Sequence, residues 1–303
     1  MMNSIETLKL DFQSQVIQLS NLKNDKISDR LTYIGSGDSY VAGLITQYLT
    51  DHKSVCYSPS DLSNSNLDKD MTYCFVSVTG KTKANISLAK RASKIGANTI
   101  AVTFNEDSKL ASVCNKVICP QIKRQKTPTA GFSSFVANVV TCMQIAGLKV
   151  PGNFDKWHKN ASKKSEHYLA SDLLSINTMF LMGNNVLYPI ALYGSFQMAE
   201  FFGSKVLAYK LEEFCHSPIF GLKKDDSMWI LGQNELEIKS TLEKLGMSIT
   251  YVECASDDVF AQVFESIFFI QSLMLRLSSK YERNELKYVT MKDVLKASSE
   301  IIY

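Results

Sequence analysis

A glutamate and a histidine within residues 187–218 have the side-chain types that proton transfer requires. Glu200 falls on a segment with helical spacing of apolar residues, and His216 follows sixteen residues later, directly before Ser217-Pro218. A carboxylate and an imidazole held by one helix, strand and loop can share a pocket and move protons on a substrate. The alternative is that Glu200 is an ordinary surface glutamate and His216 an unrelated loop histidine. Judged from these two residues alone, this alternative is favoured.

Two loops that combine glycine with hydroxyl side chains indicate where an anionic substrate would bind. Residues 34–40 (IGSGDSY) follow one predicted strand and begin a helix, and residues 77–82 (SVTGKT) do the same after another strand. Backbone N–H groups and the positive end of the helix dipole attract anions at such places. Four side chains would add hydroxyl donors to a phosphate: Ser39, Ser77, Thr79 and Thr82. Ordinary helix capping by serine and threonine is the alternative interpretation.

Neither loop fits the two best-known nucleotide motifs. A nucleotide P-loop needs glycine five positions before the glycine of its GKT sequence, and Phe75 stands there. A dinucleotide fingerprint needs glycine or alanine three positions after Gly37, where this chain has Tyr40. The loops therefore leave phosphate binding open without indicating a nucleotide.

Strands and helices alternate along the chain in a pattern that predicts an α/β fold. The predicted strands are residues 31–35, 72–78, 99–103, 117–119, 177–183, 205–209, 227–231 and 248–252. The segments with helical spacing are residues 39–49, 84–95, 133–146, 188–202, 235–245 and 260–278. Such alternation predicts a parallel sheet with right-handed crossovers in each of the two halves of the chain. Ligands bind such sheets at the carboxyl ends of the strands.

The length of 303 residues favours two domains. We expect the first domain in residues 1–150, including a leading helix near residues 5–19. Residues 151–168, with Pro151, Gly152 and several lysines, are the predicted linker. The second domain then covers residues 169–303 and ends in a charged tail on its surface.

Composition excludes several other classes of protein. The hydrophobic fraction of 45% and the charged fraction of 21% are typical of a globular protein. The seven cysteines form no CxxC pair, and the four histidines form neither HxH nor HExxH, so we expect reduced thiols and no metal site. A net charge of +3 does not indicate nucleic acid. With no signal peptide and no run of about 18 apolar residues, we expect a cytoplasmic protein without a membrane segment.

With these residues assembled, the chain resembles the sugar isomerase (SIS) family, and within it the isomerase half of the glucosamine-6-phosphate synthases. The resemblance covers nearly the whole chain as two successive SIS domains, each a flavodoxin-like three-layer sandwich. Five segments carry it: Ser36-Gly37-Asp38-Ser39, residues 77–82, residues 188–194 (YPIALYG) ahead of Glu200, Cys215-His216-Ser217-Pro218, and residues 282–290 (ERNELKYVT).

The resemblance implies a role for each matched residue. Glu200 would move the proton between C1 and C2 of an open sugar, and His216 would assist ring opening. Lys287 would form a Schiff base with an open ketose. The sugar phosphate would be held by Ser36, Gly37, Ser39, Ser77, Thr79 and Thr82. The family's histidine serves the neighbouring subunit's site, so we expect a homodimer with sites at the subunit interface, and no cofactor.

Several departures from the family pattern bear on the reaction. Val78 and Lys81 replace a glutamine and a glutamate of the phosphate loop, and Gln197 and Cys215 replace two lysines. Residues 128–132 match only loosely. We find no glutaminase domain and no cysteine at the start that could serve as its nucleophile, so we expect no use of glutamine by this chain.

These departures favour an isomerase that releases ammonia from an amino-hexose 6-phosphate, of the glucosamine 6-phosphate and fructose 6-phosphate type. Three alternatives stay open. The chain could be a phosphoglucose or phosphomannose isomerase, or the isomerase subunit of a split glucosamine-6-phosphate synthase. It could also be a non-catalytic module that binds a sugar phosphate.

Overall fold

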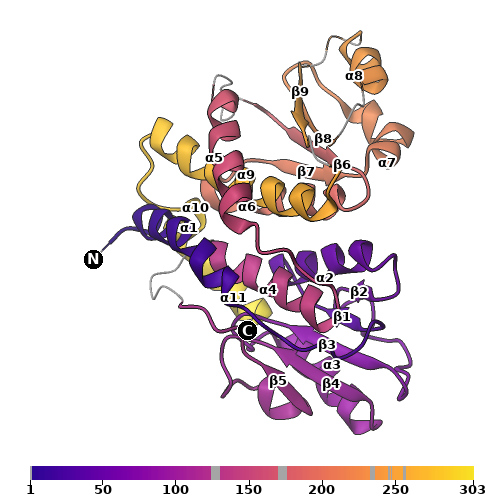
Figure 1. The fold of residues 1–303 in the computed structure, drawn as a ribbon. Coiled ribbons are helices and arrows are strands. Elements are labelled where there is room, and N and C mark those ends of the chain that lie inside the picture. The colour runs from indigo at the N-terminus through magenta and orange to yellow at the C-terminus, as the bar shows by residue number, and fades with distance from the viewer. Residues whose placement is uncertain are drawn as a thin grey trace. The chain divides into compact units, whose positions relative to one another are not determined.

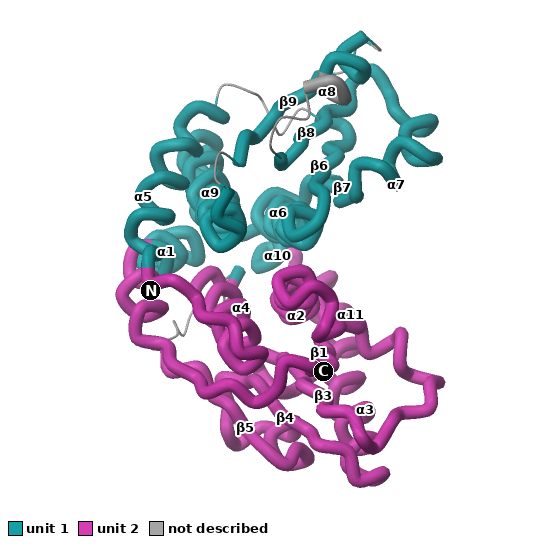
Figure 2. Tube along the Cα trace, turned by 45° about the vertical axis from the view of Figure 1, so that its right-hand side comes forward, with its two compact units in different colours: residues 1–12, 127–130, 153–290 teal, residues 13–126, 131–152, 291–303 magenta. Residues whose placement is uncertain are grey.

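The computed structural model describes residues 2–123, 130–169, 176–232, 236–244, 246, 248–254 and 257–303. The chain divides into two compact units, which are described separately here (Figure 2). Unit 1 comprises residues 1–12, 127–130 and 153–290, and unit 2 comprises residues 13–126, 131–152 and 291–303. Helix α1 (Ser4–Ser20), the expected leading helix, contributes its first residues to unit 1 and its remainder to unit 2.

Unit 2 is built on a parallel sheet of five strands in the order β2-β1-β3-β4-β5 (Figure 1). The strands are β1 (Thr32–Ile34), β2 (Val55–Tyr57), β3 (Thr72–Val76), β4 (Asn98–Val102) and β5 (Lys116–Ile118). The remaining elements are α2 (Asp38–Leu49), α3 (Lys83–Lys94), η1 (Ala111–Val113), α4 (Phe132–Ile145) and α11 (Lys292–Ile302).

Helices cover both faces of the sheet in unit 2. Tyr33 points to one face, where its hydroxyl donates to the backbone oxygen of Cys142 on α4 at 2.7 Å. The next residue, Ile34, points to the other face and joins a buried cluster with Ile86 and Leu88 of α3. Fully burying each such apolar side chain is worth about 1.5–3 kcal/mol. The alternation of side chains along β1 therefore produces three layers.

Unit 1 is built on a parallel sheet of four strands in the order β7-β6-β8-β9. The strands are β6 (Met179–Gly183), β7 (Val206–Tyr209), β8 (Ser227–Gly232) and β9 (Ser248–Glu253). The longer helices are α5 (Phe154–Ser165), α6 (Leu187–Phe202), α8 (Leu236–Glu243) and α9 (Val259–Lys280). The shorter ones are η2 (Glu166–Tyr168), α7 (Leu211–His216), η3 (Pro218–Gly221) and α10 (Lys287–Thr290).

This second sheet also lies between two helical layers. Phe180 and Met182 of β6 pack in a cluster with Phe214 of α7 and Leu242 of α8. Leu181 points the other way, toward Gly194 of α6, which also lies close to Ile270 of α9. The predicted α/β class, with two mainly parallel sheets flanked by helices, is confirmed.

Helix α9 is long and apolar enough to cross a membrane by composition alone. Within the structure, 72% of its apolar window is buried. It packs against α5, where the rings of Trp157 and Phe264 stack with centroids 5.2 Å apart. Its burial and this packing are what a core helix of a globular unit shows.

Two short regions differ from their predictions. Residues 151–168 contain helix α5 instead of a linker, because Phe154, Trp157 and Ala161 form a buried stripe among exposed lysines. His216 is the last residue of helix α7, whereas we expected it in a turn. Two predictions fall partly outside the described residues: the loosely matching segment at residues 128–129, and one predicted helix at its first residue, 235.

Candidate functional site

The two hydroxyl-bearing loops of unit 2 follow neighbouring strands at the point where the strand order reverses. From β1 the chain goes to β2 on one side and then to β3 on the other. Ile34 pairs with both Tyr57 and Phe75, so the loops after β1 and β3 leave the sheet at the same level. In open parallel sheets this switch point is where ligands bind.

The loop after β3 holds its hydroxyl groups in a fixed arrangement. Ser77 is 4% exposed, and its Oγ accepts a hydrogen bond from the Gly80 N–H at 3.2 Å. The hydroxyls of Ser77 and Thr82 are hydrogen-bonded at 3.2 Å. Thr82 is the N-cap residue of α3 but makes no side-chain cap bond, so its hydroxyl serves the loop instead. Thr79 accepts from the N–H of Lys81 at 3.3 Å.

Gly80 lets this loop pack closely against the segment that follows β4. It has φ +62°, and the side chain of Ser108 fills the space that a Cβ on Gly80 would need. The backbone N–H of Leu110 donates to the Gly80 oxygen at 3.1 Å, and the N–H of Phe104 donates to the Val78 oxygen at 3.2 Å. The segment after β4 therefore fixes the conformation of the loop. A loop fixed in this way is preorganised for binding an anion.

The loop after β1 differs because it contains a carboxylate. Ser36 and Gly37 are exposed, Ser39 is 8% exposed, and Asp38 is half-buried as the first residue of α2. Burial raises the pKa of the Asp38 carboxyl to about 7. A carboxyl with such a pKa, in the loop after the carboxyl end of a parallel strand, is a candidate functional group, and Asp38 had no predicted role of its own.

In unit 1, Glu200 and Lys287 both lie at the carboxyl end of helix α6. Glu200 is half-buried in the last turn, and the helix ends at Gly203 with φ +71°. A Cβ built on Gly203 would lie 3.1 Å from Cγ and 3.5 Å from Cε of Lys287, so the lysine stem crosses the helix end. Helix α10, which begins with Lys287, packs against α6. Two candidates 87 positions apart in the sequence thus come to one helix end.

The third candidate of unit 1 is His216, whose polar interactions in the described part of the chain include neither Glu200 nor Lys287. Its side chain is 73% exposed, and its Nε2 is 3.9 Å from Oε1 of Glu212, which is 88% exposed. An exposed pair of this kind contributes little to stability. In the part of the chain that the structure describes, His216 forms no hydrogen bond or ion pair with Glu200 or Lys287.

Gln197, one turn before Glu200, is a buried polar residue without an evident structural role. Its side chain is fully buried, and its amide has no hydrogen-bond partner among the described residues. Leaving a buried amide unsatisfied costs about 1–3 kcal/mol. The sequence marked Gln197 only as a departure from the family pattern.

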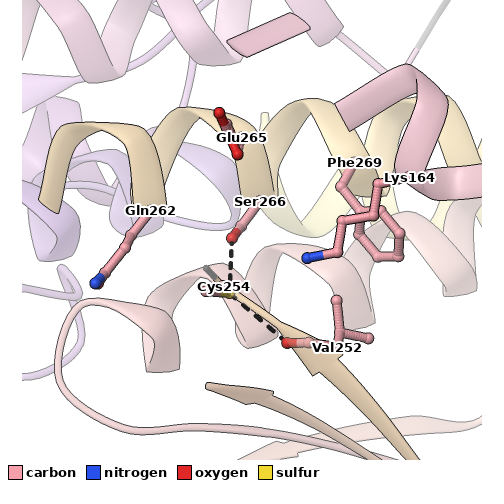
Figure 3. A pocket seen from close by; sticks show the side chains of 7 residues that line it. All are labelled: Lys164, Val252, Cys254, Gln262, Glu265, Ser266 and Phe269. Atoms are coloured by element: carbon pink, nitrogen blue, oxygen red, sulfur yellow. Dashed lines mark hydrogen bonds between the residues drawn. The ribbon is translucent and has the colours of Figure 1, made fainter. Parts of the chain in front are cut away.

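A hollow elsewhere in unit 1 shares none of the predicted residues. It has about 290 Å³ of empty space open to solvent, and the side chains of Figure 3 line it. Cys254 Sγ is 3.3 Å from Ser266 Oγ, and burial raises the pKa of this thiol. The hollow's Glu265 already accepts a hydrogen bond from Asn160 at 2.8 Å. Its Cys254, Ser266 and Glu265 side chains therefore already have partners within the protein.

The residues predicted to hold the phosphate all belong to unit 2, and Glu200, His216 and Lys287 all belong to unit 1. Each group is arranged by its own sheet and helices. Among the residues that the structure describes, no three histidine, cysteine or acidic side chains gather in a way that could hold a metal ion.

Comparison with known proteins finds a family match in part of the chain. Residues 26–147 match the SIS domain. Glutamine–fructose-6-phosphate aminotransferase (isomerizing) of Campylobacter jejuni is 23% identical over 237 residues, which are 71% of this chain. The Clostridium tetani enzyme of the same name is 25% identical over 243 residues, or 72% of this chain. The matched region spans only 40% of the length of each relative.

Solved structures share the fold over almost the whole chain. Glucosamine-6-phosphate deaminase from Thermotoga maritima superposes with a TM-score of 0.72 at 16% identity, covering 93% of this chain and 95% of that one. Tagatose-6-phosphate ketose/aldose isomerase from Escherichia coli gives a TM-score of 0.65 at 12% identity, covering 91% and 88%. Residues 26–147 therefore carry a match to the SIS domain, and the chain is similar in sequence to part of those aminotransferases.

Proposed function

We propose that this protein is a sugar-phosphate isomerase that releases ammonia from a 2-amino-hexose 6-phosphate. The observation that carries the proposal is the crossing of the Lys287 stem over Gly203, at the end of the helix that bears Glu200. A carboxylate and a primary amine at one helix end can act on adjacent carbons of one substrate. The names of the T. maritima deaminase and the aminotransferases supply the substrate class.

The phosphate would bind at the switch point of unit 2. The Ser77–Thr82 loop offers hydroxyl donors and a helix N-terminus without a nearby carboxylate of its own. The loop after β1 carries Asp38, so a phosphate dianion is better accommodated by the loop after β3. Ser36, Gly37 and Ser39 would then contact hydroxyl groups of the sugar.

The reaction would proceed by proton transfer and exchange of the amine. His216 assists opening of the ring, and Glu200 removes the proton from C2 of the open amino-aldose. Return of that proton to C1 gives an imine at C2. The Lys287 amine adds to C2 and expels ammonia, and water then hydrolyses the lysine Schiff base to the ketose. One water is consumed, and one ammonia and one ketose 6-phosphate are formed.

The exposure of His216 supports a homodimer in which this side chain serves the partner's site. A general acid that is 73% exposed and has only a surface carboxylate beside it is available to a second copy of the chain. The same proposal places the protein in the cytoplasm, which agrees with seven cysteines that are all free.

Turnover of glucosamine 6-phosphate tests the proposal. We expect equal amounts of ammonia and fructose 6-phosphate from the purified protein, and at least about a hundredfold loss with Lys287→Met. Lys224→Met, which changes another exposed lysine of unit 1, serves as the matched control. If the wild-type protein forms neither product, the proposed reaction is wrong.

A simple ketose–aldose isomerase is the second candidate. Lys287 is exposed, whereas a lysine that forms a Schiff base is commonly desolvated. The structural likeness to the E. coli tagatose-6-phosphate isomerase points in the same direction. Lys287→Met separates the two reactions, because an isomerase that needs only Glu200 and His216 would keep its activity.

A further inference from the structure

The first turn of helix α1 takes half of its hydrogen-bond partners from the tail that carries Lys287. The first four N–H groups of a helix have no partner within it. In α1, the N–H of Glu6 donates to Oδ1 of Asn3 at 2.8 Å, and the N–H of Asn3 donates to Oε2 of Glu6 at 3.4 Å. The N–H of Ser4 donates to Oε2 of Glu285 at 3.1 Å, and that of Ile5 donates to the Asn284 oxygen at 3.3 Å.

The Ser4 hydroxyl completes this connection as both a donor and an acceptor. It donates to Oε2 of Glu285 at 2.5 Å and accepts from the N–H of Leu286 at 2.8 Å. Ser4 and Leu286 are both fully buried. Hydrogen bonds shielded from water in this way are stronger and hold their geometry more tightly than exposed ones.

The segment between α9 and Lys287 is fixed at its other end as well. Glu282 has φ +50°, which turns the chain sharply out of α9, and the N–H of Arg283 donates to the Ser278 oxygen at 2.8 Å. Four residues further on, the Lys287 stem rests on Gly203. The backbone that presents Lys287 is therefore held by the end of α9 behind it and by Ser4 directly before it.

We propose that the first turn of α1 is a positioning element for Lys287, in which Ser4 and Glu285 act as positioning residues. The two contact sites lie 281 positions apart in the sequence, and both belong to unit 1. Ser4 holds the N–H of the residue that precedes Lys287, so it limits where the amine can point. The chemical consequence of this role rests on the proposed Schiff-base function.

Turnover kinetics and trapping of the lysine adduct test the proposal. Variants Ser4→Ala and Glu285→Gln remove the clamp, and Ser4→Thr keeps the hydroxyl. Thr7→Val is the matched control, because the Thr7 hydroxyl bonds to Asn3 in the same turn without touching the tail. The measurements are kcat, KM and the rate at which borohydride traps fructose 6-phosphate on Lys287.

We expect Ser4→Ala and Glu285→Gln to lower kcat and the trapping rate by about tenfold, because a small displacement of a reacting group is costly. KM should stay within about twofold, and Ser4→Thr and Thr7→Val should behave like the wild type. Equal losses in Ser4→Ala and Thr7→Val would show a role in helix stability alone and would overturn the proposal.

Hydrogen exchange separates this proposal from the proposed function. In Ser4→Ala, the amides of residues 284–290 should exchange at least about tenfold faster, while those in the middle of α9 keep the wild-type rate. Unchanged exchange in residues 284–290 would overturn the positioning role. Faster exchange in a protein whose Lys287→Met variant stays fully active would support the clamp and reject the Schiff base.

Discussion

The two sheets of this protein share one strand order over the first four strands of each unit but present different chemistry at the carboxyl ends of those strands. In both, a glycine at or directly after the end of the first strand is closely approached by the start of the following helix. A Cβ on Gly35 would lie 2.6 Å from the carbonyl carbon of Ser39, and one on Gly183 would lie 2.5 Å from the Leu187 oxygen. The same strand–turn–helix geometry therefore opens both units.

The residues that follow these glycines have different partners. In unit 1, Asn184 accepts a hydrogen bond from the N–H of Leu211 at 3.1 Å, so it fastens the start of α7. In unit 2, Ser36 and Gly37 are exposed, and Ser77 and Thr82 bond to each other within their loop. The same topology thus anchors a helix through Asn184 in unit 1 and presents hydroxyl groups, together with the Asp38 carboxyl, in unit 2.

Mixing two inactive variants should give the largest effect. If His216 serves the partner's site, Glu200→Gln and His216→Asn homodimers that exchange subunits should regain about a quarter of the wild-type activity. Mixing Glu200→Gln with Lys287→Met should regain none, because both residues belong to the same unit of one chain. Activity measured after co-refolding checks this. Recovery in neither mixture would place His216 in its own subunit's site.

Removing one hydroxyl of unit 2 should weaken binding without slowing the chemistry. Thr82→Val keeps the shape of the side chain, and the helix loses no cap bond because Thr82 makes none. A hydrogen bond to a charged group is worth about 1.5–3 kcal/mol, so KM should rise about 10- to 100-fold while kcat stays within about twofold. Ser87→Ala, on the exposed face of α3, is the control. A fall in kcat with an unchanged KM would contradict a binding role for the Thr82 hydroxyl.

The smallest predicted effect concerns Asp38 and pH. Burial raises its pKa from 3.8 to about 7, so the folded state keeps a proton that the unfolded state loses. The stability contributed by this group therefore falls as pH rises from about 4 to 7, and Asp38→Asn removes that loss. We expect the variant to melt a few degrees higher than the wild type at pH 8, since about 1 kcal/mol corresponds to roughly 2–4 °C. The two should melt alike near pH 4, and an equal difference at both pH values would contradict the assignment.

Most strands and the longer helices could be predicted from the sequence because apolar runs and helical spacing are local signals. Helix α5 was missed because its stripe of Phe154, Trp157 and Ala161 is surrounded by lysines. Helix α7 has six residues, too few to show a periodicity. The structure confirmed the fold class, and the roles of Glu200, His216 and Lys287 remain predictions.

The contacts that hold Lys287 could not be predicted. Ser4 and Glu285 are 281 positions apart, and neither carries a local pattern that would pair them. The raised pKa of Asp38 likewise comes from burial. The glycine and serine residues around Asp38 gave no indication that its carboxyl would be buried. Such features depend on tertiary packing and need the three-dimensional structure.

Solvent exchange at the substrate carbons tests the central claim most directly. In deuterated water, the wild-type protein should introduce deuterium at C1 or C2 of the sugar phosphate, and Glu200→Gln should do so at least about a hundredfold more slowly. Glu213→Gln, on the exposed side of α7, should exchange at the wild-type rate. Exchange in Glu200→Gln at the wild-type rate would show that another group moves the proton.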